Sequence, residues 1–188
     1  MTDAAPPDYI TKTELPGVFI IERPTFPDGR GFFRESFRLS DLEAQFGASI
    51  AFVQANHSRS IKNTLRGIHI APWHKLINVT SGEVQAVIAD LRPDSPTFGK
   101  YFSANLGDSN RCSIFIPAGC GNAFAVISEA PADYTYLTTD YWAAGKEHSV
   151  RFDDPDLAIK WQVSQPFVSD RDKANPSVRE TYPDKFSN

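Results

Sequence analysis

Hydrophobic positions recur in short runs along this chain, and prolines, glycines and small polar residues separate each run from the next. Several runs alternate apolar and polar residues, which is typical of strands with one buried face. Many short strands joined by polar turns favour an all-β fold, an antiparallel sandwich or jelly roll. The pattern predicts strands at 17–22, 31–37, 49–56, 64–70, 75–80, 83–90, 101–106, 111–116, 123–128, 132–138 and 150–152.

Three stretches depart from this pattern. Residues 24–31 combine prolines, an aspartate and glycines, and we expect a turn there. The segment 39–46 has the one good helical pattern, with Ser40 as its expected N-cap and Glu43 at the spacing of a capping box. The segment 164–188 is rich in proline and charged residues, and we expect coil there with one helical turn.

The bulk composition fits one globular domain. The chain has 188 residues, of which 41% are hydrophobic and 22% are charged, so it can bury a sizeable core. The formal net charge of −4 argues against a nucleic-acid surface as the main function. We therefore predict a single jelly-roll domain over 1–188, with an N-terminal arm at 1–16 and a C-terminal tail at 164–188.

Two features bear on the compartment. Cys112 and Cys120 stand eight residues apart without a CxxC pattern, and we expect two reduced, buried thiols. The N-terminus lacks the basic and apolar regions of a signal peptide, and no run is long enough to span a membrane. We expect a cytoplasmic protein without a membrane partner.

Candidate chemistry is concentrated in Leu65-Arg-Gly-Ile-His69 and in Lys75, six residues later. These residues would share one strand–loop–strand unit. The arginine can hold phosphate, the imidazole can take a proton and the ammonium can stabilise an enolate. The combination indicates carbanion chemistry on a phosphorylated sugar.

A resemblance to a known family is carried by eight motifs. The chain resembles the dTDP-4-dehydrorhamnose 3,5-epimerases, a branch of the cupin superfamily, over residues 17–176. The resemblance implies a homodimeric jelly roll without metal or cofactor, and a nucleotide-linked 4-keto-6-deoxy sugar as substrate. The motifs, in chain order, are Asp28-Gly-Arg-Gly-Phe-Phe-Arg-Glu35, Phe52-Val-Gln-Ala-Asn-His-Ser-Arg59, Leu65-Arg-Gly-Ile-His69, Asp94-Ser-Pro-Thr-Phe-Gly99, Ile116-Pro-Ala-Gly119, Tyr136-Leu-Thr-Thr-Asp-Tyr141, Asp153-Asp-Pro155 and Ser169-Asp-Arg-Asp172.

The resemblance also implies a reaction and its catalytic residues. A C4 ketone makes the hydrogens at C3 and C5 acidic, so a base can remove one of them and leave an enolate. His69 matches the family's base, and Asp172 matches the carboxylate that orients it. Lys75 matches the cation at the C4 oxygen. Tyr136 matches the acid that returns a proton to the opposite face.

Further residues match the family's substrate-binding positions. Arg66, in preference to Arg59, would hold the diphosphate. Arg30 would reach into the site of a partner subunit. Phe33 and Trp142 are aromatic positions where a base could stack. The full predicted binding set is Arg30, Phe33, Glu35, Gln54, Asn56, Arg66, Asn122, Trp142 and Glu147.

Three features depart from the family pattern. Asn122 stands where the family usually has a histidine, and an amide can donate a hydrogen bond but carries no charge. Ala86 stands where the family places an aspartate near Lys75, which predicts a less firmly held lysine. The segment between His69 and Lys75 is also shorter than the family usually has. A divergent member is indicated, with a different nucleotide, a different sugar or epimerisation at one carbon only.

Other functions stay open. The first alternative is a single-centre epimerase that acts at C3 or C5 of a GDP- or CDP-linked keto sugar. A metal-binding cupin would use His69, His74 and Glu83, although the usual pattern of two histidines one residue apart is absent. A catalytically silent binding module and a ketoisomerase on the same substrate class are further alternatives.

Overall fold

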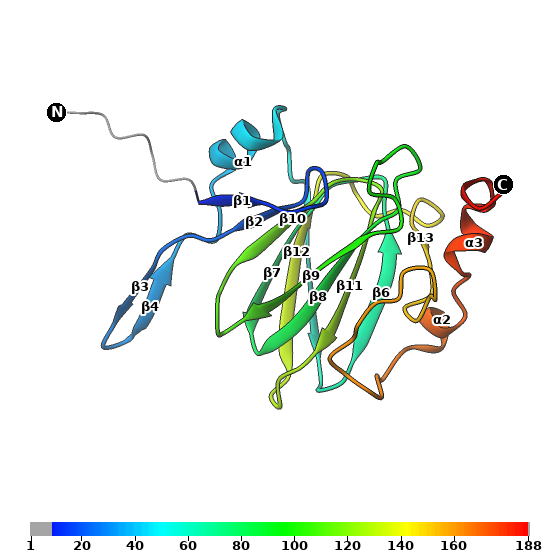
Figure 1. Ribbon diagram of the computed structural model, residues 1–188. Helices are drawn as coiled ribbons and strands as arrows, with labels where there is room; N and C mark the ends of the chain where they lie inside the picture. Colours follow the sequence, from blue (N-terminus) through cyan, green and yellow to red (C-terminus); the bar gives the residue numbers. More distant parts are fainter. Residues whose placement is uncertain (1–8, 188) are drawn as a thin grey trace.

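Two antiparallel sheets face each other in the computed structural model, which describes residues 9–187 (Figure 1). The predicted all-β sandwich is confirmed. The six-stranded sheet contains, in spatial order, β1 (Ile10–Lys12), β2 (Phe19–Ile21), β10 (Ser113–Ile116), β7 (Lys75–Ser81), β12 (Ala132–Thr138) and β5 (Gln54–Ser60). The five-stranded sheet contains β13 (His148–Ser149), β6 (Leu65–Ile70), β11 (Cys120–Val126), β8 (Glu83–Asp90) and β9 (Tyr101–Gly107).

The main core fills the space between the two sheets. Ile77 of β7 and Ile88 of β8 are fully buried there. Tyr134 of β12 stacks on Phe124 of β11 across the same space, with ring centroids 4.1 Å apart. A second apolar cluster includes Val178, a fully buried residue of the C-terminal segment. Burial of these facing side chains holds the two sheets together.

Short connections carry the chain from one sheet to the other. The predicted turn at Ser81-Gly82 joins β7 of the six-stranded sheet to β8 of the five-stranded sheet. Gly82 has a φ of +73°, and a Cβ there would lie 2.8 Å from backbone atoms of Pro131 and Ala132. Only glycine fits this close approach of two connections. The chain also changes sheets between β11 and β12.

A hairpin of β3 (Thr25–Asp28) and β4 (Gly31–Arg34) projects from the sandwich (Figure 1). The predicted turn at 24–31 is therefore wrong, because only Gly29 and Arg30 connect the two strands. Proline is tolerated in such a ribbon, since each strand of a two-stranded pair has one free edge. The strand predicted at 31–37 accordingly ends at Arg34.

The helix α1 (Leu39–Phe46) has the predicted bounds, but its predicted cap is wrong. Arg38 occupies the N-cap position without a side-chain hydrogen bond, so Ser40 lies inside the helix. Glu43 instead accepts a hydrogen bond of 2.8 Å from the backbone N–H of Ile50. Its carboxylate therefore closes the loop that follows the helix rather than the turn that begins it.

Strand β5 spans Gln54–Ser60, whereas the prediction placed a strand at 49–56. Its sequence has no apolar alternation, because its partly buried side chains lie towards a polar space and the alternate ones face solvent. Strand β13 likewise lies two residues before the predicted 150–152. Val150 still exchanges two backbone hydrogen bonds with Ile68 of β6, at 3.1 and 3.2 Å.

The C-terminal tail is more regular than predicted. It contains α2 (Asp170–Lys173), α3 (Val178–Thr181) and the 3₁₀ turn η1 (Pro183–Lys185), and it lies beside β6 and β13 (Figure 1). Ser169 and Ser177 cap the two α-helical turns with their side chains. Helices of four residues are too short to give a periodic pattern, so only the capping serines could have signalled them.

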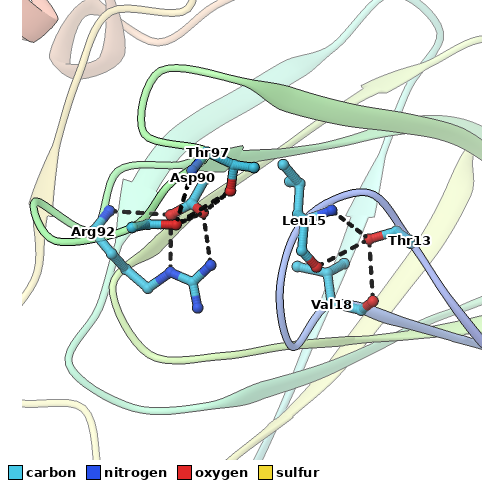
Figure 2. Close-up of polar contacts among 7 residues, drawn as sticks. Thr13, Leu15, Val18, Asp90, Arg92 and Thr97 are labelled. Carbon is cyan, nitrogen blue, oxygen red and sulfur yellow. Dashed lines mark hydrogen bonds and ion pairs between the residues drawn. The ribbon is translucent and has the colours of Figure 1, made fainter.

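A buried carboxylate fixes the loop that follows β8 (Figure 2). Asp90 accepts hydrogen bonds from Nε and Nη2 of Arg92 at 2.8 and 2.6 Å. It also accepts from the hydroxyls of Ser95 and Thr97 at 2.5 and 2.6 Å. The same figure shows Thr13, which closes the turn between β1 and β2 through hydrogen bonds to the backbone.

Both cysteines are unpaired and buried, as predicted. Burial raises the pKa of Cys112 to about 11 and that of Cys120 to about 12, so both thiols stay protonated and unreactive at neutral pH. Within residues 9–187, no helix has the length and apolar character needed to cross a bilayer. Residues 1–8 of the predicted N-terminal arm lie outside the described residues.

Candidate active site

Polar side chains of both sheets meet at one end of the sandwich, where β6 and β12 end and β5 and β7 begin. His69 of β6 lies directly opposite Asn122 of β11, so both side chains leave the five-stranded sheet on the same face. Tyr136 of β12 lies opposite Asn56 of β5 in the six-stranded sheet. Tyr134, a neighbour of Tyr136, bonds to Asn122 across the gap and joins the two groups. A single polar space between the sheets results.

His69 and Asp172 form a hydrogen-bonded pair in which Nε2 lies 3.0 Å from Oδ1. The carboxylate also accepts from the backbone N–H of Gly67 at 3.3 Å. Burial raises the pKa of Asp172, but the hydrogen bonds from His69 and Gly67 and the nearby positive charge outweigh it and bring the pKa to about 2. An ionised carboxylate can only accept, so in the tautomer that bonds to Asp172 the proton is on Nε2 and Nδ1 carries none.

Arg171 is a third member of this group, which the sequence prediction missed. Its Nη2 atom lies 2.9 Å from Nε2 of His69. Its Nε and Nη2 atoms both lie 3.3 Å from Oδ1 of Asp172. Because a guanidinium only donates, it bonds to the carboxylate whenever Nε2 is protonated. The arginine was visible in the motif Ser169-Asp-Arg-Asp172, but no sequence signal indicates that its side chain turns towards His69.

Lys75 begins β7 and is only 4% exposed, yet its ammonium has a carboxylate partner. Its Nζ lies 3.3 Å from Oε1 of Glu147 and 6.0 Å from the centre of the Tyr136 ring. Burial lowers the pKa of Lys75, and the carboxylate of Glu147 opposes that shift. The weaker hold on Lys75 that Ala86 predicts stays a prediction, although the lysine does have a carboxylate partner. The loop after β12 supplies the carboxylate that Ala86 lacks.

Tyr136 stands on the six-stranded sheet, across the space from the sheet that carries His69. Burial raises the pKa of Tyr136, and the negative charge of Glu147 raises it further. The phenol therefore keeps its proton at neutral pH, which a group that returns a proton requires.

Further polar residues lie around this space. Arg66, near the start of β6, is exposed and donates at 3.0 Å to Oγ of Ser60, the last residue of β5, so this contact lies towards the other end of the strands. Nε2 of Gln54 donates to Oδ1 of Asn56 at 2.7 Å, and Oε1 of Gln54 accepts from the backbone N–H of Trp142 at 3.1 Å. Nδ2 of Asn56 is buried without a partner among the residues that the structure describes. A buried donor of this kind indicates a position that a ligand or water would satisfy.

The indole of Trp142 is 59% exposed on the loop between β12 and β13, the loop that also carries Glu147. Nothing in the described part of the chain stacks on this indole. The loop is tied down from two sides, by the Trp142 backbone at Gln54 and by Glu147 at Lys75. It therefore holds a free aromatic face near the mouth of the polar space.

The structure does not bring Arg30, Phe33 and Glu35 to this space within one chain. The Arg30 side chain is 91% exposed at the hairpin tip and pairs with Asp28. Phe33 is 68% exposed on β4. Glu35 is held at the base of the hairpin by Arg23, at 2.5 Å. The substrate-binding roles predicted for these three residues need a second chain and stay predictions.

A groove of about 390 Å³ lies on the outer face of the six-stranded sheet. Tyr136 and Asn56 border it, but His69 and Lys75 do not. The residues that line it include Phe37, His57, Leu76, Asn78, Thr135 and Leu137. Since the proposed base and cation lie elsewhere, we place the candidate site between the sheets.

Residues 9–187 contain no group of three or more His, Cys, Asp or Glu side chains arranged to hold a metal ion. His74, a candidate ligand in the metal-binding alternative, packs edge-on against Phe46 with ring centroids 4.9 Å apart. Its Nδ1 accepts a hydrogen bond from the backbone N–H of Ala118 at 3.0 Å. Both contacts give His74 a structural role.

The geometry suits one kind of chemistry. One sheet carries an imidazole held by a carboxylate, the other sheet carries a protonated phenol, and a buried ammonium lies 6.0 Å from the centre of that phenol ring. Such a set can remove a carbon-bound proton, stabilise the resulting oxyanion and return a proton from the opposite side.

Comparisons with known proteins point to the same chemistry. A family model described as dTDP-4-dehydrorhamnose 3,5-epimerase matches residues 12–180. The dTDP-4-dehydrorhamnose 3,5-epimerase of Shigella flexneri is 40% identical over 167 residues, which cover 87% of this chain and 92% of the relative.

Two solved structures share the fold. The dTDP-6-deoxy-D-glucose-3,5-epimerase of Legionella pneumophila, solved with dTDP-4-keto-L-rhamnose, is 39% identical with a TM-score of 0.85, over 90% of this chain and 92% of that one. ChmJ, a 3′-monoepimerase of Streptomyces bikiniensis solved with dTDP-quinovose, is 30% identical with a TM-score of 0.85, over 91% and 89%. On the family match and these identities, the chain belongs to the dTDP-4-dehydrorhamnose 3,5-epimerase family.

Proposed function

We propose that this protein is an isomerase that epimerises a nucleotide-linked 4-keto-6-deoxy sugar, as a dTDP-4-dehydrorhamnose 3,5-epimerase does. One observation carries the proposal. His69 stands on one sheet and is paired at 3.0 Å with Asp172 of α2, and the protonated Tyr136 stands on the other sheet. Family membership and the dTDP-4-keto sugar bound by the Legionella relative support the substrate class.

The first half of the proposed reaction is proton removal next to the ketone. Nδ1 of His69 takes the proton, the C–H electron pair becomes part of a carbon–carbon double bond, and the C4 oxygen becomes an enolate. The ionised Asp172 stabilises the imidazolium that forms. The ammonium of Lys75 stabilises the negative charge on the C4 oxygen, which is larger in the transition state than in the ketone.

The second half is protonation of the opposite face. Tyr136 donates its phenolic proton to the carbon, the C4 ketone forms again, and the configuration of that carbon is inverted. The phenolate regains a proton and His69 releases one, so the cycle is a net isomerisation without an oxidant or reductant. Inversion of both C3 and C5 repeats the cycle with the other carbon placed between the two sheets.

Substrate binding is assigned to the residues around this centre. Arg66 is exposed beside the site and would take the diphosphate as a bidentate donor. Trp142 offers a free aromatic face to the base. Gln54 and the unpartnered amide of Asn56 would donate to the sugar or to the nucleotide. Glu147 is assigned to holding Lys75 at the pocket edge.

A homodimer is part of the proposal. The hairpin β3–β4 carries three aromatic side chains that are more than half exposed, and an arginine at its tip. Such a projecting arm suits insertion into a second copy of the chain, where Arg30, Phe33 and Glu35 would complete the partner's nucleotide site. The unpaired thiols of Cys112 and Cys120 favour the reducing cytoplasm as its compartment.

A single-centre epimerase is the second candidate. The ChmJ relative is named a 3′-monoepimerase and shares the fold at the same TM-score as the Legionella relative. The amide of Asn122 also lies next to His69, at a position where the family usually has a histidine. A changed contact there would alter how the sugar ring is presented to the base.

The test is incubation with dTDP-4-keto-6-deoxyglucose in heavy water, followed by NMR at C3 and C5. We expect deuterium at both carbons with the parent protein and loss of incorporation in His69→Ala. Deuterium at one carbon would establish the single-centre epimerase. A folded parent protein that exchanges neither carbon would overturn the proposal for this substrate, and GDP- and CDP-linked keto sugars would be tried next.

A further inference from the structure

The floor of the polar space is a hydrogen-bonded pair that joins the two sheets. The hydroxyl of Tyr134, on β12, donates to Oδ1 of Asn122, on β11, across 3.0 Å. The Tyr134 side chain is fully buried, and its ring is stacked on Phe124 with an interplanar angle of 12°. Packing of the Tyr134 ring therefore fixes the position of its hydroxyl group.

The position of Asn122 links this pair to the proposed base. Asn122 lies opposite His69 in the register of β11 and β6, so its side chain emerges beside the imidazole. The register of the two strands shifts just after this residue, between Asn122 and Phe124. On the proposed function, an amide at this place borders the space in which His69 would meet the sugar.

The hydrogen bond decides which end of the amide faces that volume. An amide has one oxygen, which accepts, and one nitrogen, which donates twice. The oxygen of Asn122 is engaged by Tyr134, and no hydrogen bond joins its Nδ2 to another residue of the described part of the chain. Burial raises the pKa of Tyr134 strongly, so its hydroxyl remains a donor at every working pH.

We infer that Tyr134 is a positioning residue, which fixes Asn122 so that its NH₂ group, and not its carbonyl, points at an oxygen atom of the substrate. The inference rests on the proposed function and adds a specificity determinant to it. The recognised group is a hydrogen-bond acceptor, a sugar oxygen or a phosphate oxygen, next to the carbon that His69 deprotonates. A free Asn122 could turn its carbonyl to the same place and repel that oxygen.

The test measures binding without turnover, by calorimetric titration with dTDP-glucose, which has no ketone and does not react. Asn122→Asp keeps the size and still accepts from Tyr134, but it replaces the donor by a charged acceptor. We expect it to weaken binding more than Asn122→Ala does. Tyr134→Phe keeps the ring stack and releases the amide, and we expect affinity to fall about threefold to tenfold, the range of one net hydrogen bond.

A double-mutant cycle separates positioning from general packing. If Tyr134 acts through Asn122, Tyr134→Phe will cost no further affinity in the Asn122→Ala background. Tyr101→Phe is the matched control, because its hydroxyl accepts from the backbone N–H of Lys160, outside the site. We expect that control to leave the affinity unchanged, whatever it does to the melting temperature.

The outcomes are distinct for the two proposals. If the parent protein binds dTDP-glucose and Tyr134→Phe binds it equally well, the role of Tyr134 is overturned. The same holds if Asn122→Asp binds as tightly as the parent protein. In both cases the proposed function still stands. An equal loss from Tyr134→Phe in both backgrounds would make Tyr134 a packing residue only. Failure of the folded parent protein to bind dTDP-glucose would overturn the substrate class and the inference together.

Discussion

Oε1 of Glu147 lies 3.3 Å from Nζ of Lys75, although the two residues are 72 positions apart in the chain. The pair joins the loop after β12 to the first residue of β7. A buried ammonium without a partner would lose its proton readily, and the carboxylate counters that tendency. The pair therefore keeps a cation in a place where burial disfavours one.

Replacing this carboxylate should move the alkaline limb of the pH–rate profile. In Glu147→Gln, burial of Lys75 is no longer opposed by a negative charge, so the pKa of Lys75 falls further. The ammonium is then lost at a lower pH, and we expect the alkaline limb of kcat to shift to lower pH. Asp140→Asn is the control, since Asp140 pairs with Lys146 in the same loop. If the alkaline limb of the pH–rate profile does not move in Glu147→Gln, the ammonium of Lys75 has no part in catalysis.

Loss of the Asp172 carboxylate should slow proton removal without unfolding the protein. Asp172→Asn keeps the shape but cannot stabilise an imidazolium, and we expect the exchange rate in heavy water to drop about 100-fold or more. Deuterium incorporation followed by NMR measures the rate, and circular dichroism checks the fold. A rate within twofold of the parent rate would show that His69 does not need its partner.

Removal of the phenol should separate exchange from inversion. Tyr136→Phe leaves His69 able to take a proton and to return one to the same face, so deuterium should still enter the substrate. The inverted product should not accumulate, because the opposite face has lost its donor. Chiral analysis of the product beside the exchange measurement distinguishes the two events. Accumulation of the inverted product at the parent rate would assign the acid to another group.

Stacking of the nucleotide base should be visible in tryptophan fluorescence. Trp142 is 59% exposed, whereas Trp73 is 4% exposed and Trp161 bonds to the Phe152 carbonyl at 2.9 Å. We expect dTDP to quench the parent protein and Trp161→Phe, but not Trp142→Phe. Trp142→Ala should weaken dTDP binding about tenfold, the order of one base–aromatic stack. Full quenching in Trp142→Phe would place the base elsewhere.

Acid stability should depend on the buried carboxylate of Asp90. Burial raises its pKa, but hydrogen bonds from Arg92, Ser95 and Thr97 bring it to about 2, below the ordinary value of 3.8. The ionised form therefore stabilises the fold above about pH 4, and this contribution disappears as the pH falls towards 2. Asp90→Asn should lose about 2 kcal/mol of unfolding free energy at pH 7 and little at pH 2. Urea unfolding at both pH values measures this, and an equal loss at both would contradict it.

The sequence pattern correctly predicted those elements that depend on interactions between residues close together in the chain. The bounds of α1 follow from periodicity, and the Ser81-Gly82 turn follows from a glycine that alone fits its conformation. Strand β5 could not be placed well, because its residues line a polar space and show no apolar alternation. The hairpin arm was hidden by Pro27, which reads as a turn residue.

The candidate site was predictable only where a family motif named the residue. His69 and Asp172 were paired in this way, and they do lie together. Nothing local indicated that Glu147 holds Lys75, because that contact depends on how a loop folds back over 72 residues. Arg171 and Tyr134 were missed for the same reason, since both act through partners that are distant in sequence.

The division of the proposed proton donor and acceptor between two sheets has an evolutionary consequence. Tyr136 and His69 are built into the rigid layers of the sandwich, and neither can move relative to the other without a change of the whole core. Related enzymes could therefore acquire new products most easily by rotating the sugar between two fixed groups. Such changes would accumulate at residues around the polar space, such as Asn122 and Trp142. Tyr136 and His69, the pair that moves protons, would keep their positions.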